Sequence, residues 1–227
     1  MIKKIKSSYI LKKIISYLYY PSRLDIFKYN KSLQNKIDLN LESYKKRSGR
    51  YIIYDDTKNK AKEYSLLNDN LVYEGEYING KRNGIGREYF YGKLDYEGEY
   101  LNGKRNGKGK EFYGVDNLVK FEGEYLNNKR NGKGKEYSWE GYLRFEGDYK
   151  DDFRNGKGKK YSSLGILRFE GEYSHDMRNG KGKEYDYFGK LEYEGEYSHD
   201  LRNGKGKKYK NNELICEVEY IHGREKS

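Results

Sequence analysis

The sequence predicts a mainly β fold: an elongated, single-layer antiparallel sheet of stacked β-hairpins, with a small α-helical module at its N-terminus. Three observations lead to this prediction. A repeat of about 24 residues covers most of the chain, each copy contains apolar residues at every second position, and glycine-rich turn sequences separate these stretches. Period two is the spacing of a half-buried strand, and Asn-Gly turns between two such strands indicate β-hairpins.

The repeat is marked by two constant elements. The first consists of an aromatic residue followed by Glu-Gly, an acidic residue and Tyr. The second, Arg-Asn-Gly-x-Gly, follows each full copy of the first. A truncated seventh copy begins at Cys216, and a degenerate copy spans residues 48–71, ahead of the array at residues 72–227. Because one hairpin cannot bury its own face, neighbouring hairpins must stack in a linear array. The first element, aromatic-Glu-Gly-acidic-Tyr, begins at Tyr73, Tyr96, Phe121, Phe145, Phe169 and Tyr193.

Composition limits the class of protein. Charged residues make up 37% of the chain and the mean hydropathy is -1.21, which excludes a protein built from membrane-spanning helices. The aromatic content of 16% is high for a disordered chain, so we expect an ordered protein with a tyrosine-rich core.

Apolar residues of the first strand form a stripe on one face, and the glutamates lie on the other. In one copy the stripe runs through Leu94, Tyr96 and Gly98. The six aromatics that open the repeats are therefore predicted to form a ladder along the sheet. Glycines such as Gly123 and Gly134 weaken a strand on their own, so we expect them to leave room for an aromatic ring from the neighbouring strand.

Residues 96–112, YEGEYLNGKRNGKGKEF, resemble the MORN repeat, named for membrane occupation and recognition nexus. The resemblance covers roughly residues 72–224, in six full copies and the truncated seventh. It implies the stacked-hairpin fold and a role in interaction. Some members of the family carry the repeats beside a catalytic domain, such as a lipid kinase or a lysine methyltransferase, but no such domain fits in this sequence.

Residues 1–47 differ from the repeats and carry most of the positive charge. They contain twelve Lys and Arg against three Asp and Glu, a net charge of +9, whereas residues 48–227 carry thirty-five against thirty-three. Apolar residues at helical spacing predict a helical module, and Pro21 ends its first helix. One interpretation is a cap that closes the open end of the sheet.

The run at residues 14–34 also resembles part of an F-box, the module that docks onto a Skp-type adaptor of cullin-type ubiquitin ligases. The usual Leu-Pro opening is missing, since the chain has Lys6-Ser7 there. The cap and the docking module are not exclusive, and both interpretations stay open. The resemblance implies adaptor contacts at Ile14, Ile15, Leu18 and Leu24.

The recurring segment KRNGKGK has the composition of a phosphate-binding loop but not its spacing, and no helix follows it. Aligned hairpins would instead bring its cations into one basic edge, able to meet lipid phosphates or an acidic partner. The alternative, which the nearly neutral repeat region favours, is that these cations pair with glutamates of the Glu-Gly-Glu strands. The cations are Lys81, Arg82, Lys104, Arg105, Lys129, Arg130, Arg154, Arg178 and Arg202.

No catalytic or metal site is predicted, and no cofactor is expected. Ser-His-Asp occurs at residues 174–176 and 198–200, but three adjacent side chains do not converge on one reacting atom. His175 and His199 lie one repeat apart, about 9–10 Å on sheet spacing, which is too far to share a zinc ion. The Glu-x-Glu pairs recur in every copy and indicate a solvated face.

These patterns predict a non-enzymatic scaffold or adaptor that binds a protein partner through an aromatic and basic groove. The alternatives are peripheral binding of anionic phospholipid, and substrate adaptation for a cullin-type ubiquitin ligase. Association of two copies is a further alternative, while nucleic acid is not expected because the repeats are nearly neutral. A single cysteine, Cys216, favours a cytoplasmic protein, peripheral at membranes in the lipid alternative.

Overall fold

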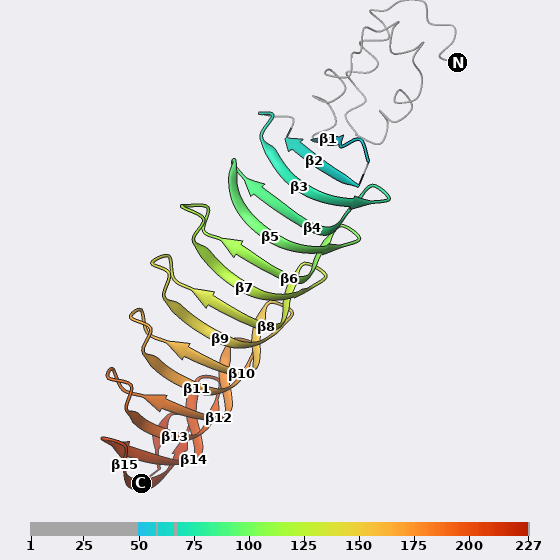
Figure 1. Ribbon diagram of the computed structural model, residues 1–227. Helices are drawn as coiled ribbons and strands as arrows, with labels where there is room; N and C mark the ends of the chain where they lie inside the picture. Colours follow the sequence, from blue (N-terminus) through green and yellow to red (C-terminus); the bar gives the residue numbers. More distant parts are fainter. Residues whose placement is uncertain (1–49, 58, 66–67, 227) are drawn as a thin grey trace, which may run out of the picture. The chain divides into compact units, whose positions relative to one another are not determined.

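The computed structural model describes residues 50–57, 59–65 and 68–226. In these ranges the chain forms strands and turns, and none of them contains a helix that could cross a membrane. Sixteen strands follow one another in hydrogen-bonded order from β1 to β16 (Figure 1). The predicted antiparallel hairpin sheet is therefore confirmed, whereas the helical module predicted at residues 1–47 lies outside the described residues.

The first of two compact units, Met1–Gly75, contains one hairpin among its described residues. Here β1 (Arg50–Tyr54) pairs antiparallel with β2 (Lys60–Ser65). Asp55 closes the connection, because its carboxylate accepts the hydroxyl of Thr57 at 2.8 Å and the backbone N–H of Lys60 at 3.1 Å. The next strand, β3 (Leu71–Ile78), continues into the second unit.

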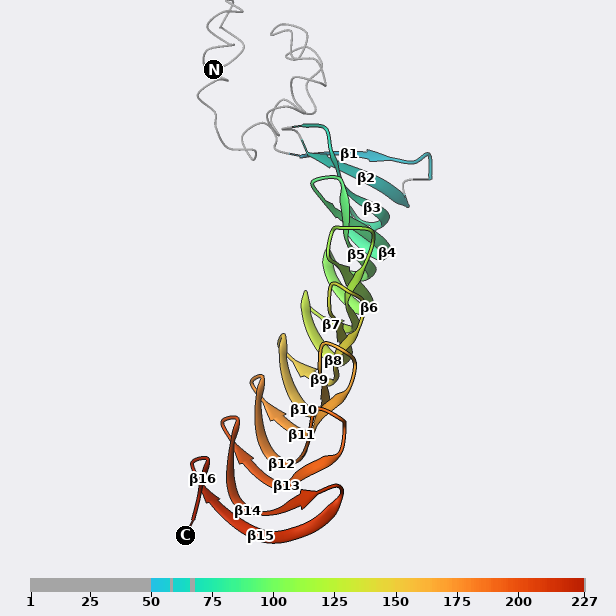
Figure 2. The same ribbon diagram turned by 90° about the vertical axis from the view of Figure 1, so that its left-hand side faces the viewer.

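The second unit, Glu76–Ser227, repeats one hairpin along the sheet, with each strand curved and all pairs antiparallel (Figure 2). The strands are β4 (Lys81–Phe90), β5 (Lys93–Leu101), β6 (Lys104–Phe112), β7 (Val119–Leu126), β8 (Lys129–Tyr137), β9 (Leu143–Lys150), β10 (Phe153–Tyr161), β11 (Leu167–Ser174), β12 (Met177–Tyr185), β13 (Leu191–Ser198), β14 (Leu201–Lys210), β15 (Glu213–Ile221) and β16 (Arg224–Glu225). From β3 to β14, strands that carry Glu-Gly-Glu (Glu-Gly-Asp in β9) alternate with strands that carry Arg-Asn-Gly-x-Gly.

In the second unit, the turn within each hairpin is only two residues long. In the β5–β6 hairpin these residues are Asn102 and Gly103, with φ angles of 52° and 85°. Two successive residues with positive φ make the turn that best matches the twist of a hairpin. The segment Arg-Asn-Gly, predicted as part of the turn, lies instead inside β6, where Gly107 at φ 97° marks an irregularity in strand pairing. A single left-handed glycine bulges a strand without reversing it.

The core is the aromatic ladder on one face of the sheet. The ladder consists of the six aromatic residues that open the repeats, and each of them is at most 2% exposed. In the second unit the Phe121 ring meets Tyr125 of its own strand and Tyr149 of the next hairpin edge-on, with centroids 5.7 and 5.2 Å apart. Such pairs add about 0.5–1.5 kcal/mol each beyond burial, so each ring fastens its hairpin to the next.

Paired glycines make room for these rings. Gly123 lies opposite Gly134, and a Cβ atom on Gly134 would come 2.5 Å from Cζ of Phe121. A Cβ atom on Gly123 would come 2.6 Å from the carbonyl oxygen of Lys133. The ring comes from the same strand as Gly123 and not from the neighbouring strand, as we predicted, because Phe121 leans two residues along its own strand.

Candidate functional site

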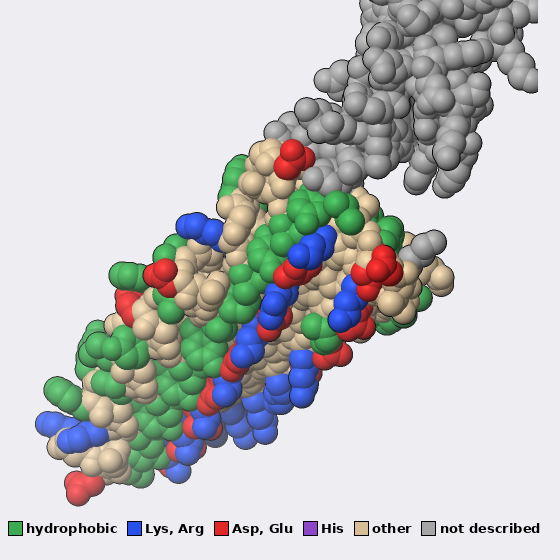
Figure 3. Space-filling view, turned by 45° about the horizontal axis from the view of Figure 1, so that its top comes forward, with side chains coloured by type: hydrophobic (Ala, Val, Ile, Leu, Met, Phe, Trp, Pro, Cys, Tyr) green, Lys and Arg blue, Asp and Glu red, His purple; other side chains and the backbone are tan. Residues whose placement is uncertain are grey.

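A groove of about 1140 Å³ runs along the face opposite the aromatic ladder, between Ile85 and Lys205. Its lining consists of nine glycines, nine glutamates, nine lysines and Ile85. Figure 3 shows two rows of alternating basic and acidic side chains with a strip of backbone between them. The prediction of an aromatic groove is therefore wrong. The ladder is buried, because the period-two alternation of the strand puts aromatics and glutamates on opposite faces.

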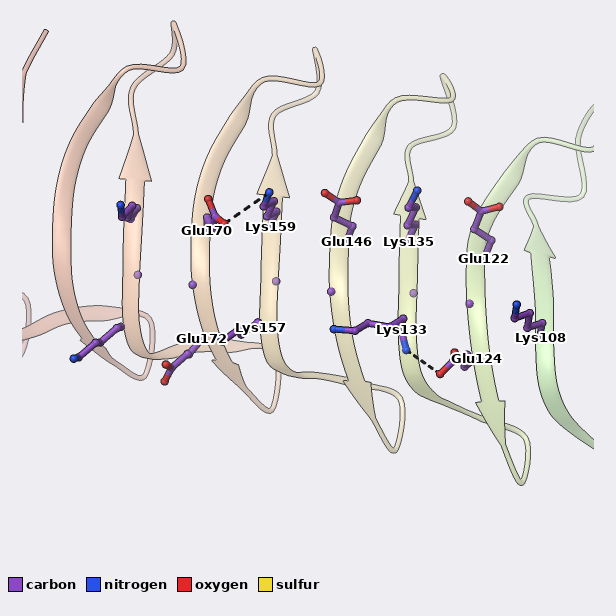
Figure 4. A pocket seen from close by; sticks show the side chains of 18 of the residues that line it. Lys108, Glu122, Glu124, Lys133, Lys135, Glu146, Lys157, Lys159, Glu170 and Glu172 are labelled. Atoms are coloured by element: carbon purple, nitrogen blue, oxygen red, sulfur yellow. Dashed lines mark hydrogen bonds and ion pairs between the residues drawn. The ribbon is translucent and has the colours of Figure 1, made fainter. Parts of the chain in front are cut away.

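Two rows of charge follow from the strand sequences. Glu122 of β7 lies opposite Lys135 of β8, and the glycine pair beside them forms the floor. Figure 4 shows Glu and Lys of successive strands in the same two rows, on either side of the glycines. Sequence reasoning assigned the glutamates to a solvated face and missed the lysines. The sequence feature that could have revealed the two rows is the matching spacing of Glu-Gly-Glu and Lys-Gly-Lys in paired strands.

The first row joins neighbouring hairpins through weak ion pairs. Lys110 Nζ lies 3.5 Å from Glu122 Oε2, and Lys159 Nζ lies 3.7 Å from Glu170 Oε1. These side chains are at least one-third exposed, and such pairs contribute less than about 1 kcal/mol. Their charges therefore stay available to a partner. The hydroxyl of Tyr137 donates to Glu122 at 2.6 Å, and this hydrogen bond lowers the pKa of the Glu122 carboxyl.

The second row has a structural use for its carboxylates. Glu124 accepts the backbone N–H of Lys133 at 3.2 Å, and Glu99 accepts that of Lys108 at 3.0 Å. A Cβ atom on Gly132 would lie 1.9 Å from Glu124 Oε2, so this position needs glycine for space as well as for its φ of 105°. The carboxylates thus satisfy backbone donors at the irregular part of each strand pair.

The arginines proposed for a basic edge lie on the aromatic face and are engaged there. The guanidinium carbon of Arg130 lies 4.1 Å from the centroid of Phe121. Its Nη2 donates to Glu111 at 2.6 Å, and its Nη1 donates to Glu136 at 3.3 Å. The glutamates come from the Lys-Glu-Tyr segments and not from the predicted Glu-Gly-Glu strands, because Glu136 lies directly opposite Phe121 on this face.

The same arrangement recurs along the second unit. Arg105, Arg154 and Arg202 lie over Tyr96, Phe145 and Tyr193, at 4.1, 4.5 and 4.4 Å from the ring centroids. The glutamates involved are Glu88, Glu111, Glu136 and Glu184, and the arginines that pair with them are Arg82, Arg105, Arg130, Arg154, Arg178 and Arg202.

The remaining predicted positions do not converge on one site. Lys81, Lys104 and Lys129 open the second strands and are exposed beside the turns. Lys129 Nζ lies 3.4 Å from Asp151 Oδ1. The proposed adaptor contacts Ile14, Ile15, Leu18 and Leu24 lie outside the described residues.

The Ser-His-Asp sequences form hairpin turns. His175 and Asp176 have φ angles of 50° and 68°, which fits the two-residue turn. The Asp176 carboxylate accepts the backbone N–H of Arg154 at 2.8 Å and so connects consecutive turns. Its oxygen is therefore directed at the backbone and not at the imidazole. No group of three potential metal ligands occurs among the described residues.

Stacked hairpins with paired glycines and repeated interhairpin contacts define a linear β-repeat protein. The family model described as the MORN repeat matches residues 73–92, 96–115, 121–138, 145–163, 169–187 and 193–213. These segments cover more than half of the sequence, and the chain belongs to the MORN repeat family. The six repeat starts predicted from the sequence are confirmed. The family is generally non-enzymatic, and the F-box-like resemblance has no counterpart in the match.

Solved structures that match parts of the chain include two of TarM. The crystal structure of TarM is 13% identical with a TM-score of 0.32, over 54% of this chain and 24% of TarM. A variant of S. aureus TarM in complex with Fondaparinux, alpha-GlcNAc-glycerol and UDP is 12% identical with a TM-score of 0.27, over 63% and 22%. The chain thus spans about a quarter of the length of TarM. No curated protein matches the chain.

Proposed function

We propose that this chain is a non-enzymatic scaffold that binds an extended segment of a protein partner in the groove. The observation that carries the proposal is the balance of the groove lining, in which nine carboxylates and nine ammonium groups flank a floor of glycine. A segment that carries both acidic and basic side chains can pair with both. Complementary charges across an interface fix the register of a partner and exclude wrong partners.

The same balance argues against a polyanion in the groove. A phospholipid surface or a nucleic acid would meet as many carboxylates as ammonium groups, so no long-range attraction would bring it to this face. The arginines on the other face already pair with glutamates. The lipid alternative would therefore depend on residues 1–47, which carry the net charge of +9 but lie outside the described residues.

The width of the floor favours an extended segment. The two charged rows stand two residues apart on each strand, which is about 7 Å along the strand. An α-helix with its side chains is about 10–12 Å across, so it would rest on the charged side chains without reaching the glycines. A single extended chain can approach the floor and alternate its side chains between the rows.

Charge reversal in the groove tests this proposal. The full chain with Lys135→Glu and Lys159→Glu is compared with wild type in affinity purification from the source cell, and the captured protein is then titrated calorimetrically. The matched control is Lys104→Glu with Lys150→Glu, which changes the same net charge beside the turns. We expect at least tenfold weaker binding for the groove variant and wild-type binding for the control. Equal affinity of wild type and both variants for the captured protein would contradict the proposal.

Two further measurements separate the alternatives that stay predictions. Co-sedimentation with phosphatidylserine-containing vesicles at physiological salt tests lipid binding, which should be strong only if residues 1–47 supply it. A pull-down with a Skp-type adaptor, using Ile14→Asp and Leu18→Asp, tests the F-box-like interpretation. The cytoplasmic location and a homodimer are also proposals, and sedimentation of the purified chain tests the second.

A further inference from the structure

On the aromatic face, three glutamates, Glu88, Glu136 and Glu184, each join two arginines of consecutive hairpins. Glu184 accepts Nη1 of Arg178 at 3.2 Å and Nη2 of Arg202 at 2.6 Å. Glu136 joins Arg130 and Arg154 in the same way. Arg130 thus uses one edge for Glu136 of its own hairpin and the other edge for Glu111 of the preceding hairpin.

In two hairpins a buried tyrosine also donates to the glutamate. The hydroxyl of Tyr125 donates to Glu111 at 2.8 Å, and that of Tyr197 reaches Glu184 at 3.3 Å. At Glu184 the carboxylate therefore receives donors from two guanidinium groups and one phenol. Charge-assisted hydrogen bonds of this kind are the strong ones in proteins.

Lysine replaces this glutamate at two positions, Lys160 of β10 and Lys208 of β14. Lys208 pairs with Glu225 of the last strand, whereas Lys160 falls between two arginines of the array. Lys160 of β10 lies opposite Phe169, just as Glu136 of β8 lies opposite Phe145. A cation therefore replaces the carboxylate between Arg154 and Arg178. In residues 68–226 Lys160 forms no ion pair, and Arg154 pairs with Glu136 alone.

The neighbours of the gap are rearranged. Nε and Nη2 of Arg178, which by the pattern would bind the preceding glutamate, donate to the carboxylate and the carbonyl oxygen of Asp200 at 3.2 and 2.6 Å. The guanidinium carbon of Arg178 lies 5.4 Å from the centroid of Phe169, farther than the others lie from their rings. The hydroxyl of Tyr173, a residue only 5% exposed, has no hydrogen-bond partner within the described part of the chain.

The electrostatics agree with a missing anion. Partial burial, followed by the charges of Arg154 and Arg178, lowers the pKa of Lys160. Burial raises the pKa of Tyr173 to about 12 against the pull of the same two arginines. Three cations therefore lie near one another without the glutamate that pairs with the arginines of the equivalent sites.

We propose that Arg154, Lys160, Arg178 and the Tyr173 hydroxyl bind a carboxylate from an acidic side chain of a protein, in the place of the missing glutamate. This site lies on the face opposite the groove, so it stands independently of the proposed function. A carboxylate is favoured over a phosphate because the equivalent sites of this chain hold one.

The surroundings favour a polypeptide source over a free small acid. A second pocket of about 550 Å³ borders Arg154 and is lined by the exposed Trp139, by Arg144 and by Ser163. It leaves room for the residues that flank a docked acidic side chain. Trp139 provides an exposed apolar surface there, and tryptophan is among the residues that most often anchor such contacts.

Thermal unfolding of the full chain in sodium acetate and in sodium chloride, at equal ionic strength, tests the carboxylate site. We expect acetate to raise the midpoint of wild type above that in chloride. Lys160→Glu should be more stable than wild type in chloride and should lose the acetate effect, because its own carboxylate fills the gap. Lys159→Glu, the same charge change on the groove face, should keep the acetate effect.

Three outcomes would overturn the proposal. One is an acetate effect that is absent in wild type or equal in Lys160→Glu. Another is a larger stabilisation by inorganic phosphate than by acetate at equal ionic strength, which would make this a phosphate site. The third concerns the source. Calorimetric titration with acetyl-hexaglutamate amide should show binding at least tenfold tighter to wild type than to Lys160→Glu, and stabilisation by acetate without peptide binding would contradict a polypeptide ligand.

Discussion

Gly147 and Gly158 lie opposite each other beneath the ring of Phe145, and this closeness is the reason for two glycines at the centre of every hairpin. A Cβ atom on Gly147 would come 2.6 Å from Cα of Gly158 and 2.6 Å from the carbonyl oxygen of Lys157. Both contacts are with backbone, which has little freedom to move within a sheet.

Gly147→Val therefore tests the ring-over-glycine packing. Its methyl groups must displace the Phe145 ring or the neighbouring strand, and we expect a loss of about 3 kcal/mol in the free energy of unfolding. The control is Gly141→Ala, which meets no atom within 4 Å and carries only the strain of φ 88°, about 1 kcal/mol. Urea titrations that gave equal losses for both variants would contradict the packing.

The sequence could not choose between two Asn-Gly pairs in one repeat. Asn102-Gly103 and Asn106-Gly107 are equivalent in composition, and only the first reverses the chain. The choice depends on register, because Tyr100 pairs with Arg105 only if the turn comes first. That pairing is set by contacts with neighbouring hairpins, which local turn preferences do not contain.

At the scale of one hairpin, arginine–glutamate bridges over aromatic rings hold the buried face together. The bridges are largely buried, since the side chains of Arg130 and Glu111 are each only 17% exposed. Ion pairs between solvent-exposed side chains contribute little to the free energy of unfolding. The residue types of the aromatic ladder were predictable from the period-two alternation. The glutamate that pairs with each arginine was not predictable, because most hairpins have glutamates on both of their faces.

Arg130→Gln and Lys129→Gln compare a buried bridge with an exposed pair at adjacent positions. Arg130→Gln leaves Glu111 with a buried, poorly paired carboxylate, so we expect a loss of about 2 kcal/mol. Lys129→Gln removes a pair whose side chains are 52% and 55% exposed, and the change should stay within about 0.5 kcal/mol. A chemical denaturation series that ranked the two variants in the opposite order would refute this view of the bridges.

Acid should weaken the same bridges. Burial alone would raise the pKa of Glu111 and Glu184, but the hydrogen bonds from Arg130 and Arg202 outweigh it and lower both below the ordinary value of 4.5. A depressed pKa means that these carboxyls contribute stability above the unfolded-state value, and lose it as the pH falls through the folded-state value. The thermal midpoint should therefore fall below about pH 4.5.

The double variant Glu111→Gln with Glu184→Gln is the control for this pH effect. It should be less stable than wild type at pH 7, and its midpoint should fall less between pH 5 and pH 3. The same slope in both proteins would show that other groups cause the acid effect.

At the scale of the repeat array, the repeat period determined what could be predicted. Six copies of one motif made the antiparallel hairpin order and the buried ladder evident, because each copy supports the same assignment. The groove was missed because it arises only when Glu-Gly-Glu of one strand is set beside Lys-Gly-Lys of the next. The lysines that replace glutamate at positions 160 and 208 were visible in the sequence, but the meaning of Lys160 required the register that places it between two arginines.

The most direct test of the groove is lysine labelling of the chain with and without its captured partner. Acetylation rates are measured by mass spectrometry for the groove lysines Lys135, Lys159 and Lys183, and for the turn lysines Lys81 and Lys104. The proposal predicts slower labelling of the groove lysines in the complex, with the turn lysines unchanged. Protection of the turn lysines, with the groove lysines labelled at the same rate as in the free chain, would contradict it.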